Sequence, residues 1–465
     1  MSEQLTDNLE PKRPSIQERM SAGKVLRKKF PRTMHGEYKP AVNRADPVSI
    51  LEQQSITRLQ ELVPIRYARM LQSPFAFLRG AAAIMAADLA ANGETTGIHV
   101  QLCGDMHVAN FGLFATAERN LVFGINDFDE TIPGPWEWDL KRLVTSVVVS
   151  GRFLGMKEKL CKDAVLATVK SYRRHLKKNA FMGNLTLWYS TISNDDLIKS
   201  IPAYDRIRAE EIFNKARTHT NLQMLEKLTD VMDEQHRIRE NPPYIIHETH
   251  TVAGRPVKEA LDLFLASYSA SLAPDRKHLF NQYRIVDVAR KVVGVGSVGM
   301  RCWIIYLEGN QDEDPLFLQM KEAQSSVLTP FVSKSSYENH GQRVVAGQRL
   351  IQGAPDIFIG WGEVDGIQFY VRQLRDMKGG IEFDPAKVNP EEYHVYCETC
   401  AWALALAHAK SGDAAMLAGY VGSSDVLDHA MVRFAFAYAD QNEKDFQLLT
   451  AAAKSGKIKI AEAGT

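Results

Sequence analysis

The residues of this chain with the clearest chemical potential lie within 101–130. Asp105 is followed five residues later by Asn110, and Asp127 comes 17 residues after Asn110, at the end of the apolar run Leu-Val-Phe-Gly-Ile. Phosphoryl transfer needs one carboxylate that orients a nucleophile, with an amide and a second carboxylate that hold Mg²⁺. Mg²⁺ takes a few hard oxygen ligands and completes its shell with water and phosphate. The spacing therefore predicts a metal and phosphate site.

A structural explanation competes with this chemical one. The pattern Gly-Asp-x-His is common, and Asp-Phe-Asp is by itself a turn signal. Both acidic turns would then be solvated loops that follow strands. The ordered combination of an acid, an amide and a further acid favours the chemical interpretation, with Asp105, Asn110 and Asp127 as the catalytic residues.

The stretch resembles the catalytic core of kinase-like phosphotransferases, the group of the aminoglycoside and choline kinases. Their loop reads His-Gly-Asp-x-His-x-x-Asn and their metal strand Ile-Asp-Phe/Trp-Asp/Glu; Cys103 stands here in place of the first His. The resemblance implies that Asp105 is the catalytic base and that Asp139, in the following segment PGPWEWDLKRL, buttresses the catalytic loop. The resemblance further implies that Asn110 and Asp127 are ligands of the metal, and that Asp129 assists at the metal without binding it directly. Asp129→Ala is expected to cost less turnover than Asp127→Ala.

A Val- and Ile-rich stretch with the alternation typical of β-strands contains Gly294-x-Gly296-x-x-Gly299. A dinucleotide-binding fold would place a helix directly after these glycines, whereas the residues that follow look like a strand. The pattern therefore favours a hairpin that lies over nucleotide phosphates, as in kinases. The nucleotide-binding residues predicted here are Gly294, Gly296, Ser297 and Gly299.

Lys321 ends the next expected strand, PLFLQMKEA, and would neutralise the charge of the α- and β-phosphates. A surface lysine at a strand end is the alternative. In kinases a glutamate of the following helix pairs with this lysine. The corresponding run YENHGQRVVAGQRLIQG offers Glu338, and Gln342 or Gln348 as substitutes.

Two more strands around Val-Asp-Gly complete a predicted sheet of five strands with one helix, the shape of a kinase N-lobe. The adenine is expected near the end of the last strand, around Gln373–Arg375, with Gln373 as the nucleotide-binding residue.

These features predict an α+β, two-lobe, protein-kinase-like fold with extra helices. The glycines and Lys321 follow the catalytic acid, and circular permutation explains this order because domain termini often lie close together at the surface. The segment 151–280 is equally consistent with a substrate-binding insert and a solvated helical subdomain. The expected divisions are 1–45 as a partly disordered N-terminal arm, 46–150 as the catalytic part of the C-lobe, 151–280 as a helical insert, 281–380 as a β-rich nucleotide-binding lobe, and 381–465 as helices returning to the C-lobe.

Composition sets further bounds on the function. Of the 465 residues, 45% are apolar and 24% charged, which is an ordinary globular balance. Lys plus Arg and Asp plus Glu both number 56, so no electrostatic argument favours nucleic acid or an anionic membrane as a partner. The chain has no run of 18 apolar residues and no apolar signal core. With only five cysteines, we expect a cytoplasmic protein.

Three further polar positions have competing explanations. Cys397 and Cys400 form Cys-x-x-Cys in a helical run, where a zinc site would need two more ligands and only His394 and His408 are suitably placed. Buried small apolar side chains are the favoured interpretation. For Asp413, in AHAKSGD, a helix stop is favoured over a second functional acid.

The motifs together are similar to those of a mostly bacterial family of uncharacterised proteins, domain of unknown function 2252, which is grouped with the kinase-like fold. The resemblance runs over most of the chain, from SPFAFLRGAAAIMAADLA through CGDMHVANFG, INDFDE, KVVGVGSVGMRCW and FLQMKEA to YADQ. It implies an ATP- and Mg²⁺-dependent phosphotransferase that acts on an unknown hydroxyl-bearing substrate. The alternatives are a nucleotidyl transferase, a nucleotide-binding pseudokinase, and a helical scaffold, which leaves the acidic motifs unexplained.

Overall fold

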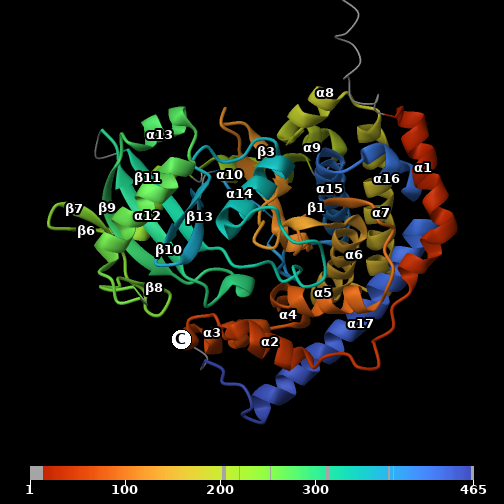
Figure 1. The fold of residues 1–465 in the computed structure, drawn as a ribbon, viewed down its shortest axis with the longest axis horizontal. Helices are drawn as coiled ribbons and strands as arrows, with labels where there is room; N and C mark the ends of the chain where they lie inside the picture. Colours follow the sequence, from red (N-terminus) through yellow and green to blue (C-terminus); the bar gives the residue numbers. More distant parts are fainter. Residues whose placement is uncertain are drawn as a thin grey trace, which may run out of the picture.

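The computed structural model describes residues 14–201, 206–218, 220–251, 253–310, 314–374, 377–380 and 382–461. Their secondary structure confirms the α+β class. A sheet lies on one side of the molecule and a group of long helices on the other (Figure 1). Within the described residues, no single helix is long and apolar enough to cross a bilayer. The bent pair α4 (Pro74–Gly80) and α5 (Ala82–Ala91) would qualify by length and composition only.

The main sheet has six strands in the order β12, β13, β11, β10, β9 and β8, and each is antiparallel to its neighbours. Five of these strands fall within 281–380, as the sequence predicts, and β8 adds a short edge. The strands are β8 (Ile245–Ile246), β9 (Arg284–Lys291), β10 (Cys302–Glu308), β11 (Pro315–Glu322), β12 (Gly360–Val364) and β13 (Ile367–Gln373).

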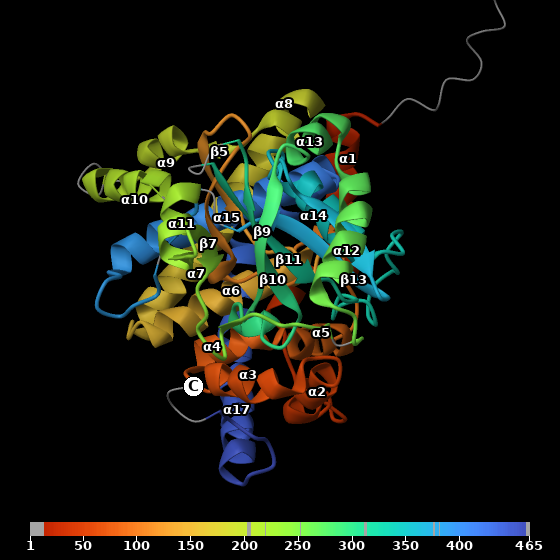
Figure 2. The same cartoon turned by 90° about the vertical axis from the view of Figure 1, so that its left-hand side faces the viewer.

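The two faces of this sheet contact different parts of the protein, since successive side chains of a strand point to opposite faces. Leu318 and Phe369 share a buried cluster with residues of α12 (Val257–Ser271). Lys321 and Tyr370, which have the opposite parity, face the helical part. Figure 2 shows the strands with the long helices behind them.

The helical part is built around α6 (Trp136–Phe153), which is buried over most of its length. The other long helices of this part are α7 (Glu158–Ala180), α15 (Pro390–Ser411) and α17 (Val426–Lys454), and the shorter α16 (Ala414–Val421) lies beside them. Every residue of α6 from Trp136 to Gly151 is buried, as expected for a helix enclosed on all sides. α7 packs along α15, and α17 packs along α6.

Two short antiparallel pairs carry the acidic motifs. β1 (His99–Leu102) pairs with β4 (Ile132–Pro135), and β2 (Phe111–Ala115) pairs with β3 (Leu121–Ile125). A short strand, β5 (Ile192–Ser193), extends the second pair. The first acidic motif therefore leaves the end of β1, and the second leaves the end of β3.

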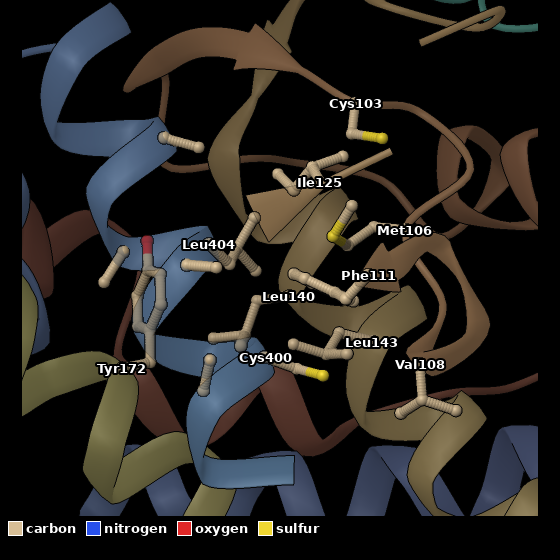
Figure 3. Packing of buried hydrophobic residues seen from close by; sticks show 14 of the residues in the cluster. Cys103, Met106, Val108, Phe111, Ile125, Leu140, Leu143, Tyr172, Cys400 and Leu404 are labelled. Atoms are coloured by element: carbon tan, nitrogen blue, oxygen red, sulfur yellow. The ribbon is translucent and has the colours of Figure 1, made fainter. Parts of the chain in front are cut away.

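The loop after β1 is anchored in the core of the helical part (Figure 3). Met106 and Val108 are fully buried in the same cluster as Leu140 of α6 and Leu404 of α15. Because these apolar side chains directly follow Asp105 in the chain, burying them fixes the backbone that carries its carboxylate.

Part of the predicted N-terminal arm forms a helix that the sequence analysis did not predict, α1 (Ile16–Lys29). It begins with a capping box, in which the Glu18 amide donates to Ser15 Oγ and the Ser15 amide donates to the Glu18 carboxylate. α1 packs closely on α16, since a Cβ at Gly23 would lie 1.9 Å from a backbone oxygen of that helix. The first 13 residues of the arm lie outside the described residues.

The segment 151–280 is distributed over both parts of the fold instead of forming one insert. α7 belongs to the long helices, and α12 covers the sheet. An amphipathic pattern shows that a helix buries one face but not against which partner. The other elements of this segment are α8 (Asn184–Tyr189), α9 (Asn194–Ser200), α10 (Arg206–Thr218), α11 (Asn221–Leu228), β6 (Thr229–Met232), β7 (Gln235–Ile238) and α13 (Pro274–Phe280).

Further helices are α2 (Pro47–Ser55), α3 (Val63–Met70) and α14 (His340–Gln352). Among the one-turn helices, η3 (Val108–Asn110) packs against α6, and η5 (Val295–Ser297) packs against α3 and α4.

Candidate active site

The hairpin of β2 and β3 explains the spacing between the amide and the second acid. Asn110 precedes β2 and Asp127 follows β3, and the pairing of Phe111 with Ile125 brings these ends together. The backbone N–H of Asn126 donates to the backbone oxygen of Asn110 at 2.8 Å. The 17-residue spacing between Asn110 and Asp127 is thus the length of one β-hairpin, whose two ends lie side by side.

The Asn110 amide also faces the first acidic loop. Its Nδ2 donates to the backbone oxygen of Asp105 at 2.6 Å. This bond orients the amide and leaves its side-chain oxygen for another partner, which suits a ligand of a hard cation.

Asp105 is bound by a residue that the sequence analysis did not single out. Arg142 of α6 donates from Nε to Asp105 Oδ1 at 2.7 Å, and its Nη2 contacts the same oxygen. The other carboxylate oxygen lies 3.8 Å from His107 Nε2. The available signal was an arginine that precedes the apolar run Leu143–Val144 in this helix, because a buried charge needs a partner.

Asp127 and Asp129 differ in how far their carboxylates are engaged. Asp129 accepts hydrogen bonds from Lys321 Nζ, from Tyr370 Oη at 2.7 Å and from Ser297 Oγ at 3.3 Å. Asp127 lies 4.0 Å from Lys321 Nζ, and its side chain is 36% exposed against 18% for Asp129. Asp127 is therefore the acid open to a ligand, and Asp129 is the partner of the lysine.

The electrostatics of this pair follow from the same contacts. Burial and the neighbouring Asp129 carboxylate raise the pKa of Asp127, and the Asp105 carboxylate adds to this shift. Burial also opposes ionisation of Asp129, but Lys321 and Tyr370 outweigh it and lower the pKa of Asp129. Burial disfavours the charged form of Lys321, yet both carboxylates raise its pKa, so the lysine is a cation.

The predicted partners of Lys321 are not its partners in the structure. Glu338 lies before α14 and is exposed, and Gln348 donates to Gln352. The backbone amide of Gln342 caps the start of α14 by donating to Asn339. The expectation that this segment supplies the partner is wrong, because Asp129, two residues after Asp127, binds the lysine directly.

α14 contacts the acidic loop through an arginine instead. Arg343 is 2% exposed, and its two Nη atoms donate to the backbone oxygens of Asp129, Thr131 and Gln324. The helix therefore fixes the backbone of the acidic loop, a role that its sequence pattern did not reveal.

The glycine-rich segment lies against the same acids. β9 and β10 form the predicted hairpin, and Ser297 in its loop is the residue that reaches Asp129. A residue from the N-terminal part of the chain binds the carbonyls of this loop: Arg58 donates to the backbone oxygens of Gly296 and Val298. Gly299 adopts φ +87°, a conformation that favours glycine. The role of Gly294 in nucleotide binding stays a prediction.

Asp139 has the role that the sequence predicts. Its carboxylate accepts the backbone amides of Cys103 at 2.7 Å and Gly104 at 3.0 Å, and His408 Nε2 lies 3.4 Å away. Gly104 has φ +85°, so the turn before Asp105 depends on this support.

We expect Asp139→Ala to lower the free energy of unfolding by about 1–3 kcal/mol, because two buried N–H groups lose their acceptor. Chemical denaturation of the variant and the wild type measures this difference. Asp440→Ala is the matched control, since that side chain is 60% exposed and its ion pair with Arg152 contributes little. Equal losses in both variants would show that Asp139 does not hold the loop.

Gln373, the residue expected to contact adenine, binds another side chain in the structure. The Gln373 side chain donates to Asp356 at 2.8 Å, and its backbone amide binds the same carboxylate. Arg375 lies outside the described residues. The adenine position therefore stays a prediction.

The polar positions outside the acidic motifs have structural roles. Cys397 and Cys400 are fully buried, as favoured, and His408 contacts Tyr172 at 2.8 Å. α15 ends at Ser411 with Gly412 as its C-cap, as the favoured helix stop predicts, and Asp413 also begins α16 by accepting the Met416 backbone amide.

The described residues contain no group of three or more His, Cys, Asp or Glu side chains that could hold a metal. Asn110 and Asp127 nevertheless offer two hard oxygen donors at one end of the β2–β3 hairpin. Such a sparse set fits Mg²⁺, which keeps water and phosphate ligands, better than a cation that needs an all-protein cage. Asp129 fits less well as a ligand because its oxygens are engaged.

Positive charge exceeds negative charge around these acids. The carboxylates are Asp105, Asp127, Asp129 and Glu130. The cations that bind or electrostatically influence them are Arg58, Arg79, Arg142, Lys321, Arg343 and Arg372. The nearby pair of Arg301 and Glu322 is neutral. The site is therefore suited to an anion that carries several charges.

A hollow on the other face of the sheet is separate from this site. It lies between α12 and the strands, and Trp303, Met320 and Phe369 line it. Met320 precedes Lys321 in β11, so the hollow and the lysine are on opposite faces. Its position excludes contact with the acids.

Fold and site define an α+β protein in which a cation-rich acidic centre joins a sheet to a helical part. Residues 58–452 match the model of the family described as "Uncharacterized protein conserved in bacteria (DUF2252)", and the chain belongs to this family. No curated protein matches the chain. No solved structure matches it either.

Proposed function

We propose that this protein is an ATP- and Mg²⁺-dependent phosphotransferase that acts on a hydroxyl-bearing acceptor. One observation carries the proposal. Lys321 of the sheet contacts Asp129, which lies 192 residues away in the chain, and lies 4.0 Å from Asp127. A cation for phosphate and an acid for a metal thus come from different parts of the protein and meet at one point.

A permuted, two-lobe kinase-like arrangement is part of this proposal. Three features support it: a glycine-rich hairpin between the first two long strands, a buried lysine on the third, and the helix α14, which packs beside β12 and β13. The helical part supplies the acid and amide on which phosphoryl transfer depends. Chain order does not matter for such a site, since convergent catalytic sites assemble from different orders.

The roles of the residues follow from their surroundings. Asn110 and Asp127 would hold Mg²⁺, which supplies neutralisation of phosphate charge when it is bound. Lys321 would bind phosphate oxygens, because it is charged and already lies among the acids. Asp105 would orient the acceptor hydroxyl through the carboxylate oxygen that Arg142 leaves free.

In the proposed step, the acceptor oxygen forms a bond to the γ-phosphorus while the bond from that phosphorus to the bridging oxygen of ADP breaks. The hydroxyl proton passes to Asp105. Its pairing with Arg142 makes this carboxylate a positioning group more than a strong base, which suffices for a loose transition state.

The experiment that tests the proposal is MgATP binding by the wild type and Lys321→Met. We expect the variant to bind about tenfold more weakly, the effect of losing roughly 1.4 kcal/mol of phosphate interaction. Calorimetry measures this difference, at a temperature where circular dichroism shows both proteins folded.

Lys159→Met is the matched control, because that lysine is 84% exposed and pairs with Asp163 on the surface. It should bind like the wild type. Failure of the wild type to bind MgATP, or equal binding by Lys321→Met, would contradict the proposal.

A further inference from the structure

Arg79 lies between the glycine-rich loop and Asp105. It stands near the end of α4, a helix that packs against η5. The backbone oxygen of Arg79 is 3.3 Å from the position that a Cβ of Gly296 would take. On its other side, Arg142 donates both to Asp105 and to the backbone oxygen of Leu78. The arginine is therefore adjacent to both halves of the site.

Within the described residues, no salt bridge joins the guanidinium of Arg79 to an acid. Its Nε is buried and lacks a hydrogen-bond partner within the described part of the chain, and its side chain stacks 5.9 Å from the ring centre of Phe75. The neighbouring arginines are engaged, since Arg142 binds Asp105 and Arg372 donates to a backbone oxygen. A buried donor without a partner is costly, so a ligand that satisfies it gains the corresponding energy.

Arg79 nevertheless acts electrostatically on the catalytic acids. Burial lowers its pKa, and the carboxylates of Asp105 and Asp127 raise it. After burial itself, the charge of Arg79 is the next cause that lowers the pKa of His107, the neighbour of Asp105. An arginine stays protonated in proteins. The positive charge of Arg79 therefore interacts with Asp105 and Asp127 without forming a salt bridge to either of them within the described residues.

We propose that Arg79 binds the phosphoryl group that is transferred, as a bidentate partner of its oxygens. This inference rests on the proposed function, and it adds a residue to that site. Asp105 would position the acceptor and Asp127 the metal, so the transferred group would lie between them, and the charge of Arg79 interacts with both of these acids. In the transition state, the negative charge of the transferred phosphoryl group is spread over three oxygens. The planar guanidinium of an arginine can donate to two of these oxygens at once.

The test compares the dissociation constants of MgATP and MgADP for the wild type, Arg79→Lys and Arg79→Gln. MgADP lacks the γ-phosphate, so only MgATP should be affected. We expect Arg79→Gln to weaken MgATP about tenfold and MgADP less than about twofold, with Arg79→Lys between, since a lysine keeps the charge but not the fork. Arg152→Gln, a surface arginine paired with Glu158 and Asp440, is the control and should change neither constant.

The outcomes separate this inference from the proposed function. A wild type that binds neither nucleotide contradicts the function itself. A wild type that binds both, with an unchanged ratio of the two constants in Arg79→Gln and Arg79→Lys, overturns the role of Arg79 alone. A parallel loss of both nucleotides in the folded Arg79→Lys protein also overturns it, because it would show that the arginine only supports the glycine-rich loop.

Discussion

Replacing Asp127 with asparagine is expected to lower Mg²⁺-dependent ATP turnover by about 10²- to 10³-fold, the effect of removing one preorganised electrostatic group. The fold should survive, because Lys321 keeps Asp129 as its partner and lies 4.0 Å from Asp127. Steady-state kinetics with varied Mg²⁺ measures the loss, and thermal unfolding monitors the fold.

The control for this substitution is Asp163→Asn, which removes a carboxylate that pairs with Lys159 on the surface. Its turnover should equal that of the wild type. Near-normal turnover by Asp127→Asn would show that this acid does not hold the metal.

Asp129→Ala is expected to lower the free energy of unfolding by about 3–5 kcal/mol, which makes it the substitution most damaging to stability. It leaves Lys321, whose side chain is 3% exposed, with the more distant Asp127 carboxylate in place of a directly bound acid, and it removes the acceptor of Tyr370. Urea denaturation measures the difference. The sequence predicts a smaller loss of turnover for Asp129→Ala than for Asp127→Ala, and the structure adds that Asp129→Ala costs more stability.

The stabilisation by Asp129 should depend on pH in one direction. Because Lys321 lowers the pKa of Asp129 in the folded protein, the stabilisation is fully present above the ordinary carboxyl pKa of about 4. It is lost as the pH falls through the lowered pKa. The stability difference between the wild type and Asp129→Ala should therefore shrink in acid, and a constant difference down to about pH 2 would contradict this pairing.

The acidic site could be predicted from the sequence because its parts are local. The strand ends at Asp105 and Asp127 are marked by apolar runs, and Asp139 follows in a short segment that returns to the loop. The strands around Lys321 could be predicted for the same reason, since alternation is a property of neighbouring residues.

The partners of these residues could not be predicted, because they come from distant elements. Arg142 and Arg343 each lie in a helix where a charged residue usually marks a solvated face, yet both are 2% exposed. Lys321 pairs with an acid 192 residues away, and no local pattern records that contact. The helix α1 was not expected, since its mean composition is polar and its support comes from α16.

The measurement that tests the central claim most directly is the identity of the products that the wild type makes from ATP labelled separately at the α- and γ-phosphates. The reaction would contain Mg²⁺ and a mixture of small hydroxyl compounds, with Asp127→Asn and a Mg²⁺-free sample as controls. Phosphoryl transfer predicts that the γ label moves to an acceptor or to water while the α label appears in ADP, and that neither happens in the controls. AMP with pyrophosphate would instead show nucleotidyl transfer, and intact ATP in every sample would contradict an enzymatic role for this site.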